Sequence, residues 1–123
     1  MKHKILNNHE THPAAKLLLG DVYLPNGLWF LYVLFLENDC FYIGITLYPQ
    51  ERIDAHFKGI GANFTKKNKP ISVVELYCLN ISDRKLSYKN ETLKTKEYRI
   101  KYGSDKVIGG KYLQLKKVKK NAT

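Results

Sequence analysis

Apolar positions along the middle of the chain fall into short runs that are separated by turn residues. The run Leu28–Leu36 (LWFLYVLFL) is rich in aromatic and branched side chains and is short enough to form a strand buried on both faces. Glu37–Asp39 has the composition of a hairpin turn, and Phe41–Thr46 predicts the strand that follows it. Ile71–Leu79 predicts a third strand. Together these runs indicate a small β-sheet.

Two helices are expected between and after these strands. A short helix is predicted over about Pro49–Lys58, because proline suits the first helical position. Ser82 and Asp83 are good N-terminal caps for a second, longer helix, and Gly103 supplies its stop. The order β-β-α-β-α predicts an α+β domain in which a small antiparallel three-stranded sheet is flanked by helices.

The longer helix has a recurring apolar position. Leu86, Leu93 and Ile100 are spaced seven residues apart, which places them on one stripe of the helix. We expect this stripe to face the sheet. Glu91 lies beside the stripe, so we expect it to border the core.

The 123 residues correspond to one domain, since single domains typically contain about 100–150 residues. Residues 1–27 are expected to form a partly ordered N-terminal lead-in, residues 28–110 the domain itself, and residues 111–123 a lysine-rich C-terminal tail. Within the domain, Gly59–Pro70 is predicted to be a basic loop.

The charge changes this picture because it is large and unevenly placed. The chain carries a net charge of +10, with net −2 over residues 1–57 and net +12 over residues 58–123. A half-molecule this basic is typical of proteins that bind a polyanion, most often nucleic acid. The alternative is a lysine surface that only keeps the protein in solution. Eighteen of the 21 basic residues are lysine, which favours diffuse attraction to phosphates over base-reading arginines.

Several classes of protein are excluded by composition. The longest apolar run has nine residues, whereas a membrane helix needs about 20, so no membrane association is expected. The polar first ten residues do not resemble a signal peptide. Cys40 and Cys78 cannot supply a disulfide framework or a four-ligand zinc site, and both are expected to be small core residues. We therefore expect a cytoplasmic protein.

Six residues of the predicted domain are not explained by packing alone: Tyr32, Tyr42, Gly44, Arg52, His56 and Glu91. At these residues the sequence resembles the GIY-YIG nucleases. Phe30-Leu31-Tyr32 stands at the first signature, although the family's glycine is Phe30 here, and Tyr42-Ile43-Gly44 stands at the second. Arg52 and His56 follow, and Asp83–Glu91 resembles the family's helix with the metal-binding glutamate. The resemblance covers roughly residues 28–101 and is closest to small members similar to the nuclease module of DNA excision-repair enzymes.

A shared site makes a geometric demand on the predicted hairpin. Side chains alternate between the two faces of a strand, so a two-residue loop would place Tyr32 and Tyr42 on opposite faces of the sheet. A three-residue loop over Glu37–Asp39, with Leu36 opposite Cys40, places both tyrosines on one face, so a shared site requires such an odd loop or a β-bulge.

The resemblance also implies a role for each residue. One divalent ion, Mg²⁺ or Mn²⁺, would be held by Glu91, and Arg52 would pair with the scissile phosphate. Tyr32 would accept or relay the proton of the attacking water, with His56 as the rival for that task. Tyr42 would orient the water or the phosphate. Gly44 would let the substrate approach the backbone, and phosphate contacts are expected from Lys66, Lys67 and Lys69.

The leading hypothesis is therefore a metal-dependent endonuclease that cuts DNA by in-line attack of water. Low sequence specificity is expected, with a preference for single-stranded or structured DNA. The alternatives are a catalytically inactive nucleic-acid-binding module of the same fold and a nuclease directed at RNA. No small-molecule cofactor is expected. A monomer is expected, with a dimer left open.

Overall fold

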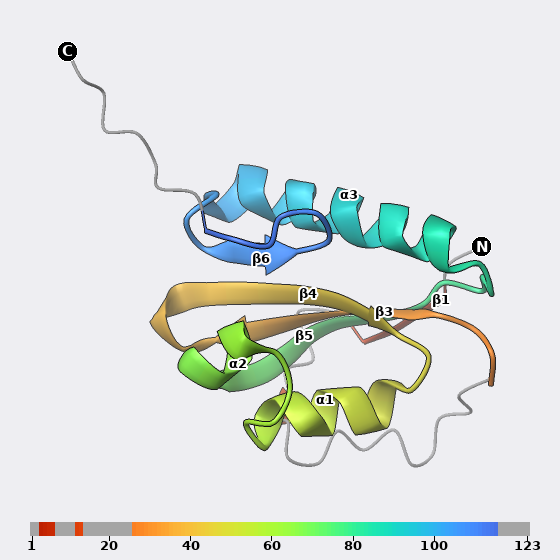
Figure 1. The fold of residues 1–123 in the computed structure, drawn as a ribbon, viewed down its shortest axis with the longest axis horizontal. Helices are drawn as coiled ribbons and strands as arrows, with labels where there is room; N and C mark the ends of the chain where they lie inside the picture. The colour runs from red at the N-terminus through yellow and green to blue at the C-terminus, as the bar shows by residue number, and fades with distance from the viewer. Residues whose placement is uncertain (1–2, 7–11, 14–25, 116–123) are drawn as a thin grey trace.

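The structure is a computed structural model, and it describes residues 3–6, 12–13 and 26–115 (Figure 1). The helices are α1 (Pro49–Phe57), α2 (Asn63–Lys67) and α3 (Arg84–Tyr102). The strands are β1 (His3–Leu6), β2 (His12–Pro13), β3 (Phe30–Leu36), β4 (Cys40–Thr46), β5 (Pro70–Cys78) and β6 (Val107–Gly109). Long helix α3 lies on one side of the sheet, and α1 and α2 lie on the other (Figure 1).

The predicted α+β class is confirmed, but the sheet is larger than three strands. Its order is β1-β5-β3-β4-β6, and β2 also pairs with β5. The expectation of an entirely antiparallel sheet is wrong at one edge, because β6 pairs with β4 in parallel. Strands β1, β2 and β6 have only two to four residues each, which is too short to show a hydrophobic alternation in the sequence. They form because they pair with the edges of the larger strands.

The β3–β4 hairpin has the odd loop that a shared site requires. Leu36 stands opposite Cys40, and Tyr32 stands opposite Gly44. The loop Glu37–Asp39 is a short 3₁₀ turn, in which Asn38 has φ of 64°. Asparagine tolerates this left-handed backbone better than most residues. The three-residue prediction is confirmed, and Tyr32 and Tyr42 lie on one face with ring centroids 6.3 Å apart.

Side chains alternate between the two faces of β3, so this strand contributes residues to two hydrophobic cores, one on each face of the sheet. Tyr32 and Leu34 pack with Ile53 of α1 on one face, whereas Leu31 and Val33 pack on the other face with the cluster that contains Tyr98 of α3. Because both faces are covered, β3 is apolar along nearly its whole length and is buried, as predicted. Free thiols Cys40 and Cys78 are buried in the first core, which confirms the expectation for both cysteines.

Helix α3 begins and ends as predicted, but it is rotated relative to the expected stripe. Asp83 caps its first turn through a 2.8 Å bond from the Lys85 N–H, and Gly103 follows its last residue. The exposed fractions of Leu86, Leu93 and Ile100 are 47%, 66% and 79%, so the predicted sheet-facing stripe is wrong.

The buried residues of α3 are instead Ser87, Thr95, Tyr98 and Arg99. Thr95 is buried, and a Cβ placed on Gly109 of β6 would lie only 2.4 Å from its Oγ1. At Thr95, strand β6 thus approaches the helix so closely that a large side chain would not fit at this position. The hydroxyls of Ser87 and Thr95 are satisfied within the helix, since they donate to the carbonyls of Asp83 and Glu91.

Three further expectations are resolved in part. The predicted basic loop Gly59–Pro70 contains the short helix α2. The first part of the predicted tail is packed, because Arg99 donates to the Gln114 carbonyl at 2.7 Å and lies over the Tyr112 ring. Most of the 1–27 lead-in and residues 116–123 of the tail lie outside the described residues. No helix within the described ranges is long and apolar enough to cross a membrane.

Candidate active site

Four of the predicted site residues meet on the face of the sheet that α1 covers. Tyr32 comes from β3, Tyr42 from β4, and Arg52 and His56 from α1. Residues four apart on a helix share a face, which explains how α1 presents Arg52 and His56 together. The His56 ring lies 5.5 Å from the Tyr32 ring and 4.9 Å from the Tyr42 ring, between centroids. The hairpin register and one helix face are therefore sufficient to assemble the cluster.

His56 stands behind Tyr32 and contacts it directly. Its Nε2 lies 2.7 Å from Tyr32 Oη, and its Nδ1 lies 2.9 Å from Thr65 Oγ1. The exposed fractions of Tyr32 and His56 are 1% and 0%. Thr65, which lies on α2, was not singled out by the sequence, because the segment that contains it has the composition of a basic loop. A threonine nine residues beyond a candidate histidine forms no recognisable pattern with it.

Burial sets the charge state of this pair. Burial raises the pKa of Tyr32 above its ordinary value, and the Arg52 guanidinium only partly opposes this. Burial, helped by the positive charge of Arg52, lowers the pKa of His56 to about 3. Both side chains are therefore neutral near pH 7.

Arg52 links the two tyrosines. Its guanidinium is half-buried, and its positive charge acts on the hydroxyls of both Tyr32 and Tyr42. Burial raises the pKa of Tyr42 as well, and Arg52 again opposes the shift. A guanidinium has five donors in a planar fork, so two tyrosine partners leave donors for a further oxygen anion.

The structure accounts for glycine at position 44 by packing. A Cβ at Gly44 would lie 2.3 Å from Tyr32 Oη and 2.5 Å from its Cζ, so the Tyr32 ring occupies the place of a side chain. Glycine at position 44 leaves the space that the ring of Tyr32, the residue opposite it in the hairpin, occupies. The predicted approach of substrate to the Gly44 backbone stays a prediction.

Glu91 acts on the tyrosines of the cluster electrostatically. It lies on α3, and one carboxylate oxygen accepts a 2.9 Å hydrogen bond from the Gly110 N–H. Its negative charge raises the pKa of both Tyr32 and Tyr42. Burial raises the pKa of Glu91, whereas the Gly110 N–H and the charge of Arg84 lower it. Gly110 was not singled out by the sequence.

Glu91 offers a single carboxylate to a hard divalent cation. Within the described ranges, no group of three His, Cys, Asp or Glu side chains could hold a metal ion. A protein cage for a metal is therefore absent from this part of the chain. A single carboxylate with one oxygen anchored by Gly110 suits Mg²⁺, which commonly keeps several waters and takes one or two carboxylates.

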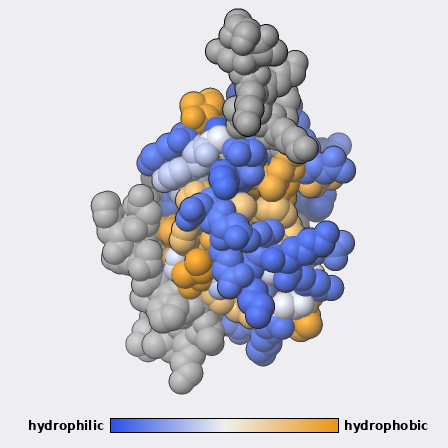
Figure 2. Space-filling model, turned by 90° about the vertical axis from the view of Figure 1, so that its left-hand side faces the viewer, coloured by the Kyte–Doolittle hydropathy of each residue, from blue (hydrophilic) through white to orange (hydrophobic). Residues whose placement is uncertain are grey.

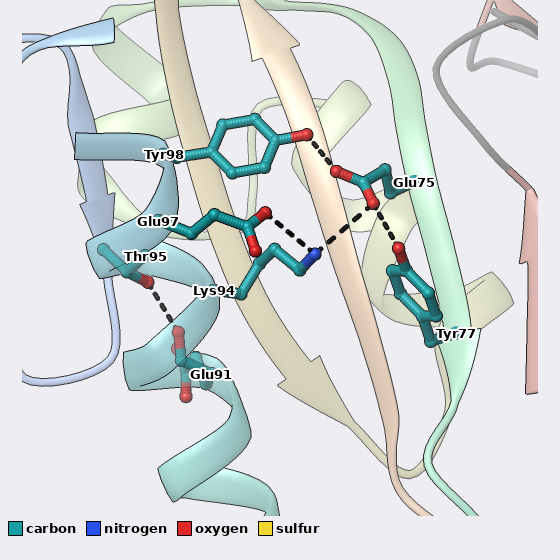
Figure 3. Close-up of polar contacts among 7 residues, drawn as sticks. All are labelled: Glu75, Tyr77, Glu91, Lys94, Thr95, Glu97 and Tyr98. Carbon is teal, nitrogen blue, oxygen red and sulfur yellow. Dashed lines mark hydrogen bonds and ion pairs between the residues drawn. The ribbon is translucent and has the colours of Figure 1, made fainter. Parts of the chain in front are cut away.

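A buried carboxylate lies on the other face of the sheet and does not belong to this cluster. Glu75 of β5 accepts hydrogen bonds from the hydroxyls of Tyr77 and Tyr98, and its Oε1 lies 3.6 Å from Lys94 Nζ (Figure 3). Lys94 also contacts Glu97 at 3.1 Å. Glu75 stands opposite Val33, on the face of the sheet away from Tyr32. This network ties α3 to β5.

The predicted phosphate-binding lysines are exposed. Lys66 and Lys67 end α2, and Lys69 precedes β5. Because Thr65 is buried against His56, α2 brings its exposed lysines to the same side of the sheet as the cluster. Figure 2 looks onto the end of the molecule that contains the hairpin and α2, where hydrophilic side chains cover most of the described surface.

Comparison with known proteins agrees with this arrangement. The model of the GIY-YIG catalytic domain matches residues 28–106, which is more than half of the chain. The chain belongs to the GIY-YIG family. This family is one of nucleases that act on nucleic acid, so the chain carries a nuclease-type hydrolase domain.

Relatives among known proteins are bacterial UPF0213 proteins. The chain is 44% identical over 45 residues to one from Neisseria meningitidis serogroup A, which covers 37% of this chain and 50% of that protein. It is 41% identical over 46 residues to one from Xanthomonas campestris pv. campestris, which covers 37% of this chain and 45% of that protein. The matched region thus spans about half the length of these relatives. No solved structure matches the chain.

Proposed function

We propose that this GIY-YIG domain is a metal-dependent endonuclease that hydrolyses phosphodiester bonds in DNA by in-line attack of water. The observation that carries the proposal is the convergence of two tyrosines, an arginine and a histidine, with Tyr32 bonded to His56 and Arg52 acting on both tyrosines. The pronounced excess of basic residues after position 57 supports a polyanionic substrate.

Arg52 is the group best suited to the scissile phosphate. It is permanently charged, and its planar fork matches two phosphate oxygens. It is half-buried on α1 beside Tyr32 and Tyr42, so its charge is already at the cluster before substrate arrives. Positive charge fixed in this way stabilises the extra negative charge that develops on phosphorus as water attacks.

Tyr32 and His56 together would act as the general base. Tyr32 and His56 are both buried, and Tyr32 Oη lies 2.7 Å from His56 Nε2 while the charge of Arg52, the proposed phosphate ligand, acts on the same hydroxyl. The position beside Arg52 favours Tyr32 as the group that takes the proton of the attacking water while it passes its own proton to His56 Nε2. Tyr42, which is half-buried beside both rings, would orient the water or the phosphate.

Glu91 would hold the divalent ion, through the carboxylate oxygen that Gly110 does not anchor. When bound, such an ion supplies Lewis-acid stabilisation of negative charge on the phosphate or the leaving oxygen. The lysines of α2 would contact phosphates along the flanking strand. Because the cluster contains no base-reading element, low sequence specificity follows, with single-stranded or structured DNA as the preferred substrate.

The test is cleavage of fluorescent single-stranded, nicked and duplex DNA, and of RNA, with Mg²⁺, Mn²⁺ or EDTA. We expect metal-dependent cutting that Glu91→Gln and Arg52→Ala abolish, whereas Lys94→Gln, in the separate Glu75 network, leaves it intact. Wild-type binding without cutting under either metal would contradict the proposal and indicate a binding module. Faster cutting of RNA than of any DNA would reassign the substrate.

A further inference from the structure

The hydroxyl of Thr65 decides which nitrogen of His56 carries the proton. Thr65 Oγ1 donates to the Ala62 carbonyl oxygen at 3.0 Å and lies 2.9 Å from His56 Nδ1. A hydroxyl has one hydrogen, and here that hydrogen is given to Ala62. Toward His56 the oxygen can therefore only accept, so Nδ1 must carry the imidazole proton.

The opposite arrangement loses hydrogen bonds. If Thr65 donated to Nδ1 instead, the Thr65 and Ala62 oxygens would face each other at 3.0 Å with no hydrogen between them. The Nε2–H would then occupy Tyr32 Oη, and the Tyr32 hydrogen would have to turn away from His56. Its neighbour on that side, Arg52, has only donors. Only the Nδ1–H form satisfies all three contacts at once.

The imidazole is also held in a single neutral state and orientation. His56 is fully buried, and its pKa is lowered to about 3, so it carries one ring proton near pH 7. A Cβ at Gly61 would lie 2.5 Å from Nδ1, which means that the loop before α2 passes directly over the ring. Helix α2 and this loop form a lid over His56, and Thr65 is the polar contact that the lid makes with it.

We propose that Thr65 is a positioning residue that fixes His56 as the Nδ1–H tautomer and thereby turns the Tyr32 hydrogen inward, toward Nε2. The lone pairs of Tyr32 Oη then face Arg52 and the substrate side. Resting on the proposed nuclease function, this lets Tyr32 Oη take the proton of the attacking water while its own proton passes to Nε2, which leaves an imidazolium that keeps its Nδ1–H bond to Thr65. With the other tautomer, Tyr32 would present a donor to the phosphate and could not act as a base.

The tautomer can be measured without any nuclease activity. In a long-range ¹H–¹⁵N correlation spectrum of the full chain at neutral pH, His56 should show a pyrrole-type Nδ1 and a pyridine-type Nε2. The His56 signals are assigned by their loss in His56→Gln. Thr65→Ser keeps the hydroxyl and should keep this pattern, whereas Thr65→Val should shift the population toward Nε2–H.

The matched control is Thr92→Val. This substitution removes a buried hydroxyl that has no hydrogen-bond partner within the described chain, so the His56 pattern should not change. An Nε2–H tautomer in the wild type would overturn the proposal, as would an unchanged tautomer in a folded Thr65→Val. If Thr65→Val does not fold, the wild-type and Thr65→Ser spectra still decide.

Activity provides a separate readout. We expect Thr65→Val to lower kcat by roughly tenfold or more with little change in KM, since general-base assistance contributes about 10²–10⁴-fold, and Thr65→Ser to restore it. A shifted tautomer with unchanged kcat would overturn the acceptor role of Tyr32. A wild-type protein that shows the Nδ1–H tautomer but cuts nothing would refute the proposed nuclease function while confirming the hydrogen-bond assignment.

Discussion

Tyr32 occupies the space that a side chain at position 44 would need, since a Cβ at Gly44 would lie 2.3 Å from Tyr32 Oη. The two residues stand directly opposite each other in the β3–β4 hairpin. The far end of the tyrosine cannot move aside freely, because its hydroxyl contacts His56 in the buried core. The glycine of the second signature and the tyrosine of the first are thus parts of one packing unit.

Gly44→Ala should therefore displace Tyr32 and break its contact with His56. Overpacking of a filled core costs about 1–3 kcal/mol, so we expect a loss of unfolding free energy in that range, measured by denaturant titration. We also expect loss of DNA cleavage. Gly27→Ala is the control, because a Cβ there meets nothing within 4 Å and the cost comes only from its φ of +78°. It should lose stability and keep cleavage; loss of cleavage in both variants would contradict the assignment.

The depressed pKa of His56 predicts a pH-dependent stability. Between the ordinary pKa of about 6.5 and the native value of about 3, the unfolded chain binds a proton at this residue that the folded protein does not. Folding should therefore weaken as pH falls through this window, by at most about 1.4 kcal/mol per pH unit from this residue. His56→Gln should be visibly less sensitive between pH 6 and pH 4 in chemical denaturation. Parallel curves for the two proteins would contradict a buried neutral imidazole.

The exposed lysines of α2 and the residues after it predict a salt-sensitive interaction with nucleic acid. Binding should weaken steeply between about 50 and 200 mM salt, since each neutralised phosphate releases counterions. Replacing Lys66, Lys67 and Lys69 by glutamine should lower the slope of log K against log salt by about 0.7–0.9 for each phosphate that is no longer neutralised. Fluorescence anisotropy with labelled DNA measures this slope.

The charge-matched comparison for this triple variant lies on α3. It replaces three exposed lysines of that helix by glutamine: Lys89, Lys96 and Lys101. Helix α3 covers the opposite face of the sheet, so these substitutions should change the slope less. Equal slopes in both triple variants would remove α2 from the binding face.

Thr92 offers a stabilising substitution. Its hydroxyl is buried with no hydrogen-bond partner in the part of the chain that the structure describes, and it packs against Gly110. Leaving such a group unsatisfied costs about 1–3 kcal/mol, so Thr92→Val, which keeps the shape, should raise the unfolding free energy by up to that amount. Thr65→Val should do the reverse, since it breaks bonds to His56 and Ala62. Thermal and denaturant unfolding of both variants provide the comparison.

Much of the site could be predicted from local sequence because its geometry is local. Tyr32 and Tyr42 share a face since a three-residue loop sets the register, and the asparagine and aspartate of that loop favour the turn. Arg52 and His56 share a helix face since they are four residues apart. The caps of α3 could be read in the same way, because Asp83 and Gly103 act within one turn.

Sequence reasoning was less successful where partners come from distant segments. The stripe Leu86, Leu93 and Ile100 has good helical spacing, yet it faces outward. Other residues form the inner face of α3, where the close approach of β6 demands a small side chain at Thr95 and Tyr98 packs in the core. Thr65 and Gly110 were missed for the same kind of reason. Each matters only through one contact, with His56 or with Glu91, that the spacing of residues does not encode.

The sequence by itself determined the central hairpin, the boundaries of α1 and α3, and the signature residues, because hydrophobic alternation, turn chemistry and helix capping act over a few residues. The tertiary structure alone decided the rotation of α3, the edge strands and the bonding of His56 between Tyr32 and Thr65. These features depend on close packing and on hydrogen bonds between segments that meet only in the folded chain, where burial makes each unsatisfied group costly.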